Sequence, residues 1–180
     1  MPREIWVASN RRVLGVALVP PAGLLIVGFG MYLASNTRDW QSTAGLVMSV
    51  VSAVGIGFLI RELFRPRVAY RPGHVEFYLR GGAPLAVPLE SVEAFFLGQG
   101  EALLPAKVHL QMETVTLVAR LSRRAQEWSH VEVNPVLGRW CDGYVTIRGT
   151  WCEPLTVELV ERLNRRLYEL GREHRAGNSK

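Results

Sequence analysis

Two long runs of uncharged residues dominate the hydrophobic pattern in the first third of the chain. They extend from Val13 to Ala34 and from Trp40 to Ile60, and neither contains Asp, Glu, Lys or Arg. At about 1.5 Å per residue, some 20 apolar helical residues span the roughly 30 Å hydrocarbon core of a bilayer. The pattern therefore predicts two transmembrane helices, over about 13–34 and 40–60, joined by the polar loop 35–39.

The first run contains a proline pair, Pro20-Pro21. Proline inside a helix removes a hydrogen bond and clashes with the preceding turn, so we expect a kink near Pro20 or a helix whose most regular part begins there. A cleaved signal peptide is the alternative, since Arg11-Arg12 precede the run and Ala34 follows it. The length of the run and the second run directly after it favour a transmembrane span.

The residues after the second run alternate between apolar and polar side chains, as in strands with one buried face. Val75, Phe77 and Leu79 share a face, and Gly81-Gly82 predicts a hairpin turn. A turn or bulge is expected near Glu113, where the alternation changes parity. The other expected elements are strands over 85–89, 92–97 (ended by 98–100), 108–112, 115–121, 130–133 and 144–148, and a loop or single helical turn over 122–128.

An amphipathic helix is expected at the C-terminus. Pro154 suits the first helical position, and Gly171 ends the pattern, which leaves 172–180 as a loose tail. One apolar stripe at helical spacing is formed by Leu155, Leu159, Val160, Leu163, Leu167 and Leu170.

Arginines flank both ends of the paired spans. They are Arg3, Arg11 and Arg12 before the first span and Arg61, Arg65, Arg67 and Arg71 after the second. Positive residues mark the cytoplasmic side, so we expect an inner-membrane protein with both termini in the cytoplasm. Cys141 and Cys152 would then lie in a reducing compartment, where a structural disulfide is not expected.

Composition adds little to this topology. The chain has 180 residues, 48% of them hydrophobic and 21% charged, with a net charge of +5. From Arg61 onward 17 basic residues face 14 acidic ones, so no strong basic patch indicates a nucleic-acid partner. The basic cluster after the second span has two interpretations. It holds the domain against anionic lipid at about 1 kcal/mol per charge, or it only fixes topology.

Motifs for catalysis or cofactor binding are missing from the sequence. It has no glycine-rich phosphate loop, no nucleophile elbow and no His-Glu-x-x-His motif. His74 and Glu76 fall on the same outward face of a strand, which is typical of a solvated surface. We therefore expect neither an enzyme nor a bound cofactor or metal.

The pattern Trp-Cys-acid occurs twice, eleven residues apart, at Trp140-Cys141 and Trp151-Cys152. Three interpretations stay open. The tryptophans and cysteines fill the core, the tryptophans line a groove for a partner, or the thiolates bind a metal together with His130.

Small residues recur every four positions along the second span, at Gly45, Ser49, Ala53 and Gly57. Such a ridge lets another helix approach closely. It packs against the first span, helped by Gly23 and Gly30, or against a second copy of the chain, or it has no packing role.

Seven or so antiparallel strands followed by one helix resemble the pleckstrin-homology-like (PH-like) domain of bacterial membrane proteins that begin with a helical hairpin. The likeness is carried by Gly73–Tyr78, by Val87–Glu93 and by the closing helix, and it covers residues 68–171. It implies a hairpin followed by a cytoplasmic, mainly-β PH-like barrel with a C-terminal capping helix. Such domains usually act as adaptors.

These observations predict a membrane-anchored adaptor whose PH-like domain binds an unidentified cytoplasmic protein or the inner membrane surface. The alternative is an accessory subunit of a membrane transport or envelope-assembly complex. The expected organisation is a cytoplasmic N-terminus over 1–12, two spans within 13–62, a basic linker over 63–72, the PH-like domain over 73–171 and a tail over 172–180.

Overall fold

The computed structural model describes residues 3–34, 40–101 and 113–178. The chain forms two compact units. One unit comprises residues 10–65, and the other combines the residues up to Ser9 with those from Pro66 onward. The second unit is therefore discontinuous in sequence, because the first is inserted into it.

The inserted unit contains the helices α1 (Arg11–Ala17), α2 (Val19–Ala34) and α3 (Trp40–Leu63). The first apolar run is interrupted at Leu18, and α2 begins at Val19, in agreement with the irregularity expected near Pro20. Pro20 and Pro21 have no N–H to donate to the preceding turn, so the regular α-helical hydrogen bonding cannot continue there.

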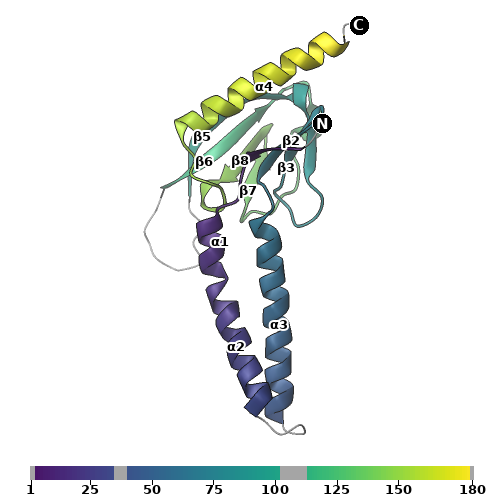
Figure 1. The fold of residues 1–180 in the computed structure, drawn as a ribbon. Coiled ribbons are helices and arrows are strands. Elements are labelled where there is room, and N and C mark those ends of the chain that lie inside the picture. Colours follow the sequence, from purple (N-terminus) through teal and green to yellow (C-terminus); the bar gives the residue numbers. More distant parts are fainter. Residues whose placement is uncertain (1–2, 35–39, 102–112, 179–180) are drawn as a thin grey trace. The chain divides into compact units, whose positions relative to one another are not determined.

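The helical segments Arg11–Ala34 and Trp40–Leu63 each have 24 residues and a mean hydropathy of 2.1 in their most apolar window. They are long and apolar enough to cross a membrane. Only 11% of that window is buried in either segment, whereas the core helix of a soluble protein would be mostly buried. α2 and α3 pack along each other (Figure 1).

The first antiparallel sheet has the order β1-β2-β3-β4. Its strands are β1 (Glu4–Val7), β2 (Val68–Arg71), β3 (His74–Phe77) and β4 (Leu85–Pro88). β1 precedes the apolar helices and β2 follows them, yet Ile5 pairs with Ala69 and Val7 with Val68. The sequence pattern placed residues 4–7 outside the domain and residues 68–71 in a basic linker, so both strands were missed. Each strand has only four residues, which makes alternation a weak signal.

Side chains from the C-terminal region also hold β1 in place. Arg166 donates from Nε and Nη2 to the Glu4 carboxylate at 3.0–3.2 Å. The Ala8 N–H donates to Glu153 Oε1 at 2.9 Å, and the Glu153 N–H donates to the Ala8 carbonyl at 3.0 Å. Trp6 is buried and stacks on Tyr70. The N-terminal strand is thus an integral part of the domain.

The second antiparallel sheet has the order β5-β6-β8-β7. Its strands are β5 (Val92–Glu101), β6 (Glu113–Leu121), β7 (Gly138–Cys141) and β8 (Tyr144–Arg148). Three expectations were wrong. β5 continues through Gly98–Gly100, residues 130–133 form no strand, and β7 was not predicted. The segment 122–128, expected as a loop or a single helical turn, is a loop that ends in the short helix η2 (Gln126–Trp128). The strand predicted over 108–112, with the parity change after it, lies outside the described residues.

The domain is thus mainly antiparallel β, followed by a helix, as expected. Its strands form two four-stranded sheets, however, and not the closed barrel that the sequence analysis predicted. The core lies between the sheets and includes Phe77, Phe95 and Trp140.

The C-terminal helix α4 (Val157–Asn178) packs along β5 (Figure 1). It also contacts the short helix η1 (Leu89–Ser91). The predicted stripe is confirmed at Leu159, Leu163, Leu167 and Leu170, which are all buried. Both predicted ends were wrong. α4 begins at Val157, where Thr156 Oγ1 accepts from the Leu159 N–H, and it continues through Gly171.

Candidate functional site

α2 and α3 approach each other closely at two glycines, Gly28 and Gly45. A Cβ on Gly28 would lie 3.0 Å from the Gly45 carbonyl oxygen, and a Cβ on Gly45 would lie 2.7 Å from the Gly28 carbonyl oxygen. Ser49 lies at the same contact, and its Oγ donates to the Gly45 carbonyl at 2.8 Å. Glycine is needed at this crossing because backbone atoms occupy the space of a side chain.

Packing of the predicted small-residue ridge against the first span is confirmed at Gly45 and Ser49 only, and packing against a second copy stays a prediction. Ala53 is exposed, and nothing lies within 4 Å of a Cβ on Gly57, Gly23 or Gly30. The residues of α3 that face the contact are instead spaced alternately by three and four positions. A strict four-residue repeat does not stay on one face, because the α-helix has about 3.6 residues per turn. The contacting residues are Ser42, Gly45, Ser49 and Ser52.

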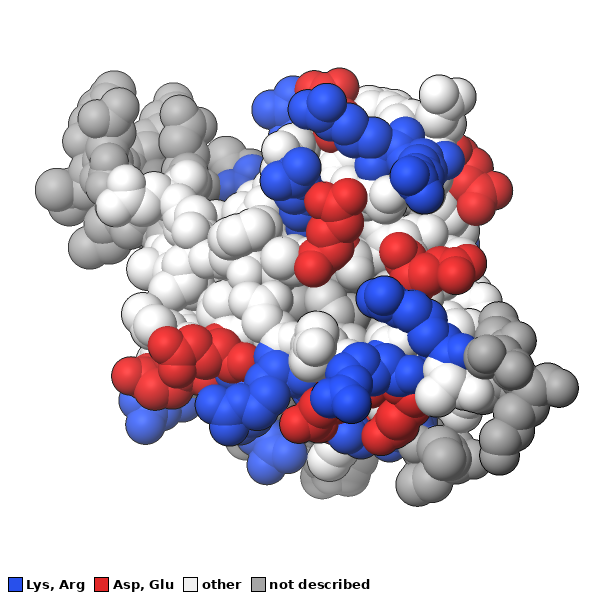
Figure 2. Space-filling model, turned by 90° about the horizontal axis from the view of Figure 1, so that it is seen from above, with Lys and Arg blue, Asp and Glu red and all other residues white. Residues whose placement is uncertain are grey.

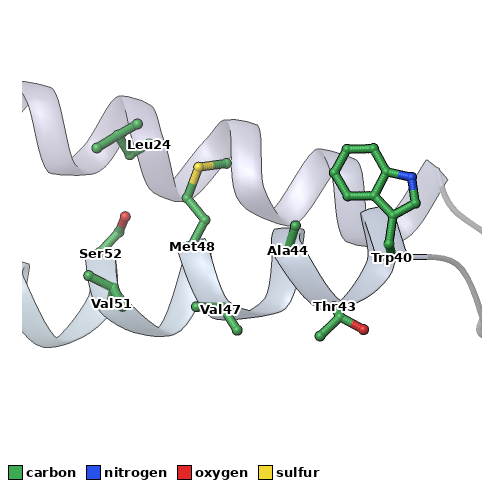
Figure 3. Close-up of a pocket in the computed structure, with 8 residues that line it drawn as sticks. All are labelled: Leu24, Trp40, Thr43, Ala44, Val47, Met48, Val51 and Ser52. Carbon is green, nitrogen blue, oxygen red and sulfur yellow. The ribbon is translucent and has the colours of Figure 1, made fainter.

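A shallow apolar groove of about 730 Å³ lies beside α3 (Figure 3). Its lining comes almost entirely from α3, with Leu24 of α2 at one side. The residues are Leu24, Trp40, Thr43, Ala44, Val47, Met48, Val51 and Ser52. They contain no ionisable group, so the groove lacks the charged side chains that usually mark an ion or proton pathway.

The four arginines after the second apolar run have different environments. Arg67 is only 2% exposed, and its Nε donates to the Trp151 carbonyl at 3.2 Å. Arg65 pairs with Glu62 at 3.2 Å, and both side chains are largely buried. Arg61 and Arg71 are exposed. The predicted membrane-surface cluster was wrong for Arg67, because a buried guanidinium is not accessible to a lipid headgroup.

The two tryptophans of the repeated Trp-Cys-acid pattern do not line a common groove. Trp140 is buried in the core, where its ring packs edge-on against Phe77 and its Nε1 donates to the Trp128 carbonyl at 2.7 Å. Trp151 is half-buried in η3 (Gly149–Trp151). The core interpretation is therefore the correct one for Trp140, and the partner-groove interpretation was wrong for it.

Both cysteines are free thiols in different environments. Cys141 Sγ is partly exposed and lies 3.3 Å from an Asp142 carboxylate oxygen. Cys152 is buried, its Sγ donates to the Arg148 carbonyl, and burial raises the pKa of its thiol to about 12. Within the described ranges no three His, Cys, Asp or Glu side chains form a group that could hold a metal ion.

A groove of about 510 Å³ lies between the start of β5 and the C-terminal half of α4, and we call it the β5–α4 groove. Its floor contains the buried side chains of Leu89, Val92 and Leu167. Its other lining residues are mostly polar or charged: Glu90, Glu93, Ala94, Asn164, Tyr168, Gly171, His174 and Arg175. An apolar floor with a polar rim is the usual anatomy of a protein-binding surface.

Asn164 fixes the spacing between α4 and β5. Its side-chain amide accepts from the Phe95 N–H at 2.7 Å and donates to the Phe95 carbonyl at 2.9 Å. These are backbone groups on the edge of the second sheet, so the amide takes the place of a neighbouring strand. The groove is therefore bordered by a fixed helix and a fixed strand.

The outward face of the first sheet carries a buried carboxylate that the sequence analysis placed in solvent. Glu76 is only 4% exposed, whereas His74 is exposed as expected. The Tyr78 hydroxyl donates to Glu76 Oε2 at 2.6 Å, and Arg3 and Arg71 lie 3.6 and 3.7 Å from its oxygens. A cavity of about 440 Å³, the Glu76 pocket, is lined by Arg3, Arg71, Glu76, Tyr78 and Pro84.

No protein-family model, no curated protein and no solved structure matches this chain. The resemblance to PH-like domains therefore stays a prediction. The β5–α4 groove and the Glu76 pocket were both missed from the sequence. The weak signal for the pocket was a glutamate between two apolar residues, Val75 and Phe77, of a short strand.

Proposed function

We propose that this protein is a membrane-anchored adaptor whose two-sheet domain binds a partner protein on the cytoplasmic side of the inner membrane. The observation that carries the proposal is the insertion of two long apolar helices between two paired strands of one sheet. Neither apolar run contains a charged residue. The apolar helices are therefore suited to anchoring the protein in the membrane, and we assign partner binding to the two-sheet domain.

The strand pairing also supports the expected topology. β1 and β2 belong to one sheet, so the chain that leaves after Ser9 must return on the same side at Pro66. Two crossings of the membrane return the chain to the side from which it left, whereas an odd number of crossings does not. The arginine-rich flanks favour the cytoplasm for that side. A reporter active only in the cytoplasm should work after Lys180 and be silent at Asn36, which lies outside the described residues. The reverse result would refute the topology.

A protein partner is favoured over the lipid surface as the target of the domain. Of the four arginines expected to contact lipid, Arg67 is buried and Arg65 is paired with Glu62. Figure 2 shows basic and acidic side chains interspersed on the face of the domain that it presents, without one continuous basic patch. Anionic lipid attracts clustered positive charge, and a mixed surface weakens that attraction.

The β5–α4 groove is the surface we assign to the partner. Tyr168 on its rim is 66% exposed, and exposed aromatic side chains are enriched among the residues that dominate binding energies. The partner segment would place apolar side chains on the floor and polar groups against Glu90 and Arg175.

A photo-crosslinking amino acid tests this assignment in cells. It replaces Tyr168 in the full-length protein, and in a matched control it replaces Tyr144, an exposed tyrosine (46%) in β8 of the second sheet. We expect a discrete crosslinked product from position 168 that is absent from position 144. Equal products from both positions, or none from position 168, would contradict the assignment of the groove.

A further inference from the structure

The Glu76 pocket lies over a part of the first sheet where the neighbouring side chains are small. In the strand register Glu76 stands between Ala69 of β2 and Ala86 of β4. Arg3, Arg71, Tyr78 and Pro84 line the sides of the pocket, so a buried carboxylate forms the floor of an open cavity.

The two arginines are held over this carboxylate without being bonded to it. Their closest contacts with Glu76 are 3.6 and 3.7 Å, longer than a hydrogen bond, whereas the Tyr78 hydroxyl donates to Glu76 at 2.6 Å. In the described part of the chain, Glu76 is the one acidic side chain within 4 Å of either guanidinium. Glu76 therefore attracts both groups to one place and leaves their N–H donors available.

Arg3 is also oriented by an aromatic ring. Its guanidinium carbon lies 4.8 Å from the centroid of the Tyr78 ring. Stacking uses the face of the guanidinium, and its N–H groups all point outward in the plane of the group. Arg71 is 72% exposed and pairs in register with His74, so it borders the open side of the cavity. Two guanidinium edges thus converge on one cavity.

We propose that the Glu76 pocket binds the carboxylate of a small organic acid. Planar carboxylates match the fork of N–H donors on arginine. Arg3, Arg71 and Glu76 carry a formal net charge of +1, so a single negative charge neutralises the pocket. A dianionic phosphate would leave excess negative charge above a buried carboxylate. The volume of about 440 Å³ lies in the range of small-molecule sites, and Pro84 offers an apolar wall for the body of the acid.

Thermal unfolding of the full-length protein in detergent tests this proposal, with sodium benzoate as the probe. Sodium chloride and inorganic phosphate at equal ionic strength are the reference salts. We expect benzoate to raise the unfolding temperature in a saturable way, because a ligand that binds only the folded state stabilises it. Chloride and phosphate should not produce this saturable shift.

Arginine variants then assign the effect to the pocket. Arg71→Gln should weaken benzoate binding at least about tenfold, since charge-assisted hydrogen bonds contribute roughly 1.5–3 kcal/mol. Arg139→Gln, which removes an exposed arginine of β7 and the same charge, should bind benzoate like the wild type. Arg71 is exposed, so its replacement leaves the fold intact. A benzoate shift no larger than that of phosphate, or an unchanged shift in Arg71→Gln, would overturn the proposal.

Discussion

Removing β1 should unfold a domain that looks complete in sequence. A fragment that begins at Pro66 contains every strand and helix of the domain except β1. It lacks Trp6 and Val7, which are 4% and 0% exposed in the core. It also exposes the edge of β2 and leaves Arg166 without its partner Glu4.

The loss can be estimated from these two side chains. A buried tryptophan removes roughly 200 Å² from water, which at about 25 cal/mol per Å² is about 5 kcal/mol. Val7 adds roughly 1.5–3 kcal/mol. The free energy of unfolding of a typical domain is about 5–15 kcal/mol, so the fragment loses a large part or all of it.

The matched protein restores β1 without the apolar helices. Residues 3–9 are joined to residues 66–180 by an eight-residue Gly/Ser linker, which spans on the order of 15 Å. This is long enough because the Arg67 N–H donates to the Val7 carbonyl at 2.8 Å. Circular dichroism should show a cooperative thermal transition for the joined protein and none for the fragment. If the two proteins melt at the same temperature, β1 is not integral to the domain.

Three further predictions concern single residues. Gly45→Leu should lower the unfolding temperature of the full chain in detergent, because its Cβ would meet the backbone of α2. The expected cost in the free energy of unfolding is roughly 1–3 kcal/mol. Ala53→Leu, at an exposed position of the same helix, should have little effect. The raised pKa of Cys152 keeps its thiol protonated in the folded state, whereas the thiol of the unfolded chain ionises from about pH 9. The free energy of unfolding should therefore fall between about pH 9 and 12. A maleimide should therefore label Cys141 before Cys152, and Cys152→Ala should reduce the loss of stability at high pH. Thr156→Ala removes the N-terminal cap of α4 and should cost about 1 kcal/mol in urea unfolding, with no loss if the cap is unimportant.

Elements with a strong local pattern could be predicted from the sequence. The two long apolar helices and the break before Pro20 follow from hydropathy and from the missing proline N–H. The apolar stripe of α4 follows from helical spacing. The ends of α4 could not be predicted, because proline and glycine signal a helix end only when the surrounding chain makes use of them.

The sequence alone thus determined the two long apolar helices, the strands β3, β4, β5, β6 and β8 in outline, and the apolar stripe of α4. Only the tertiary structure decided which elements meet. It paired β1 with β2 across the inserted helices, because Trp6 and Val7 fill a core that distant residues build. It crossed α2 and α3 at Gly28 and Gly45, and it buried Glu76 beneath two arginines. These contacts depend on packing and charge between segments far apart in the chain, and local periodicity carries no information about them.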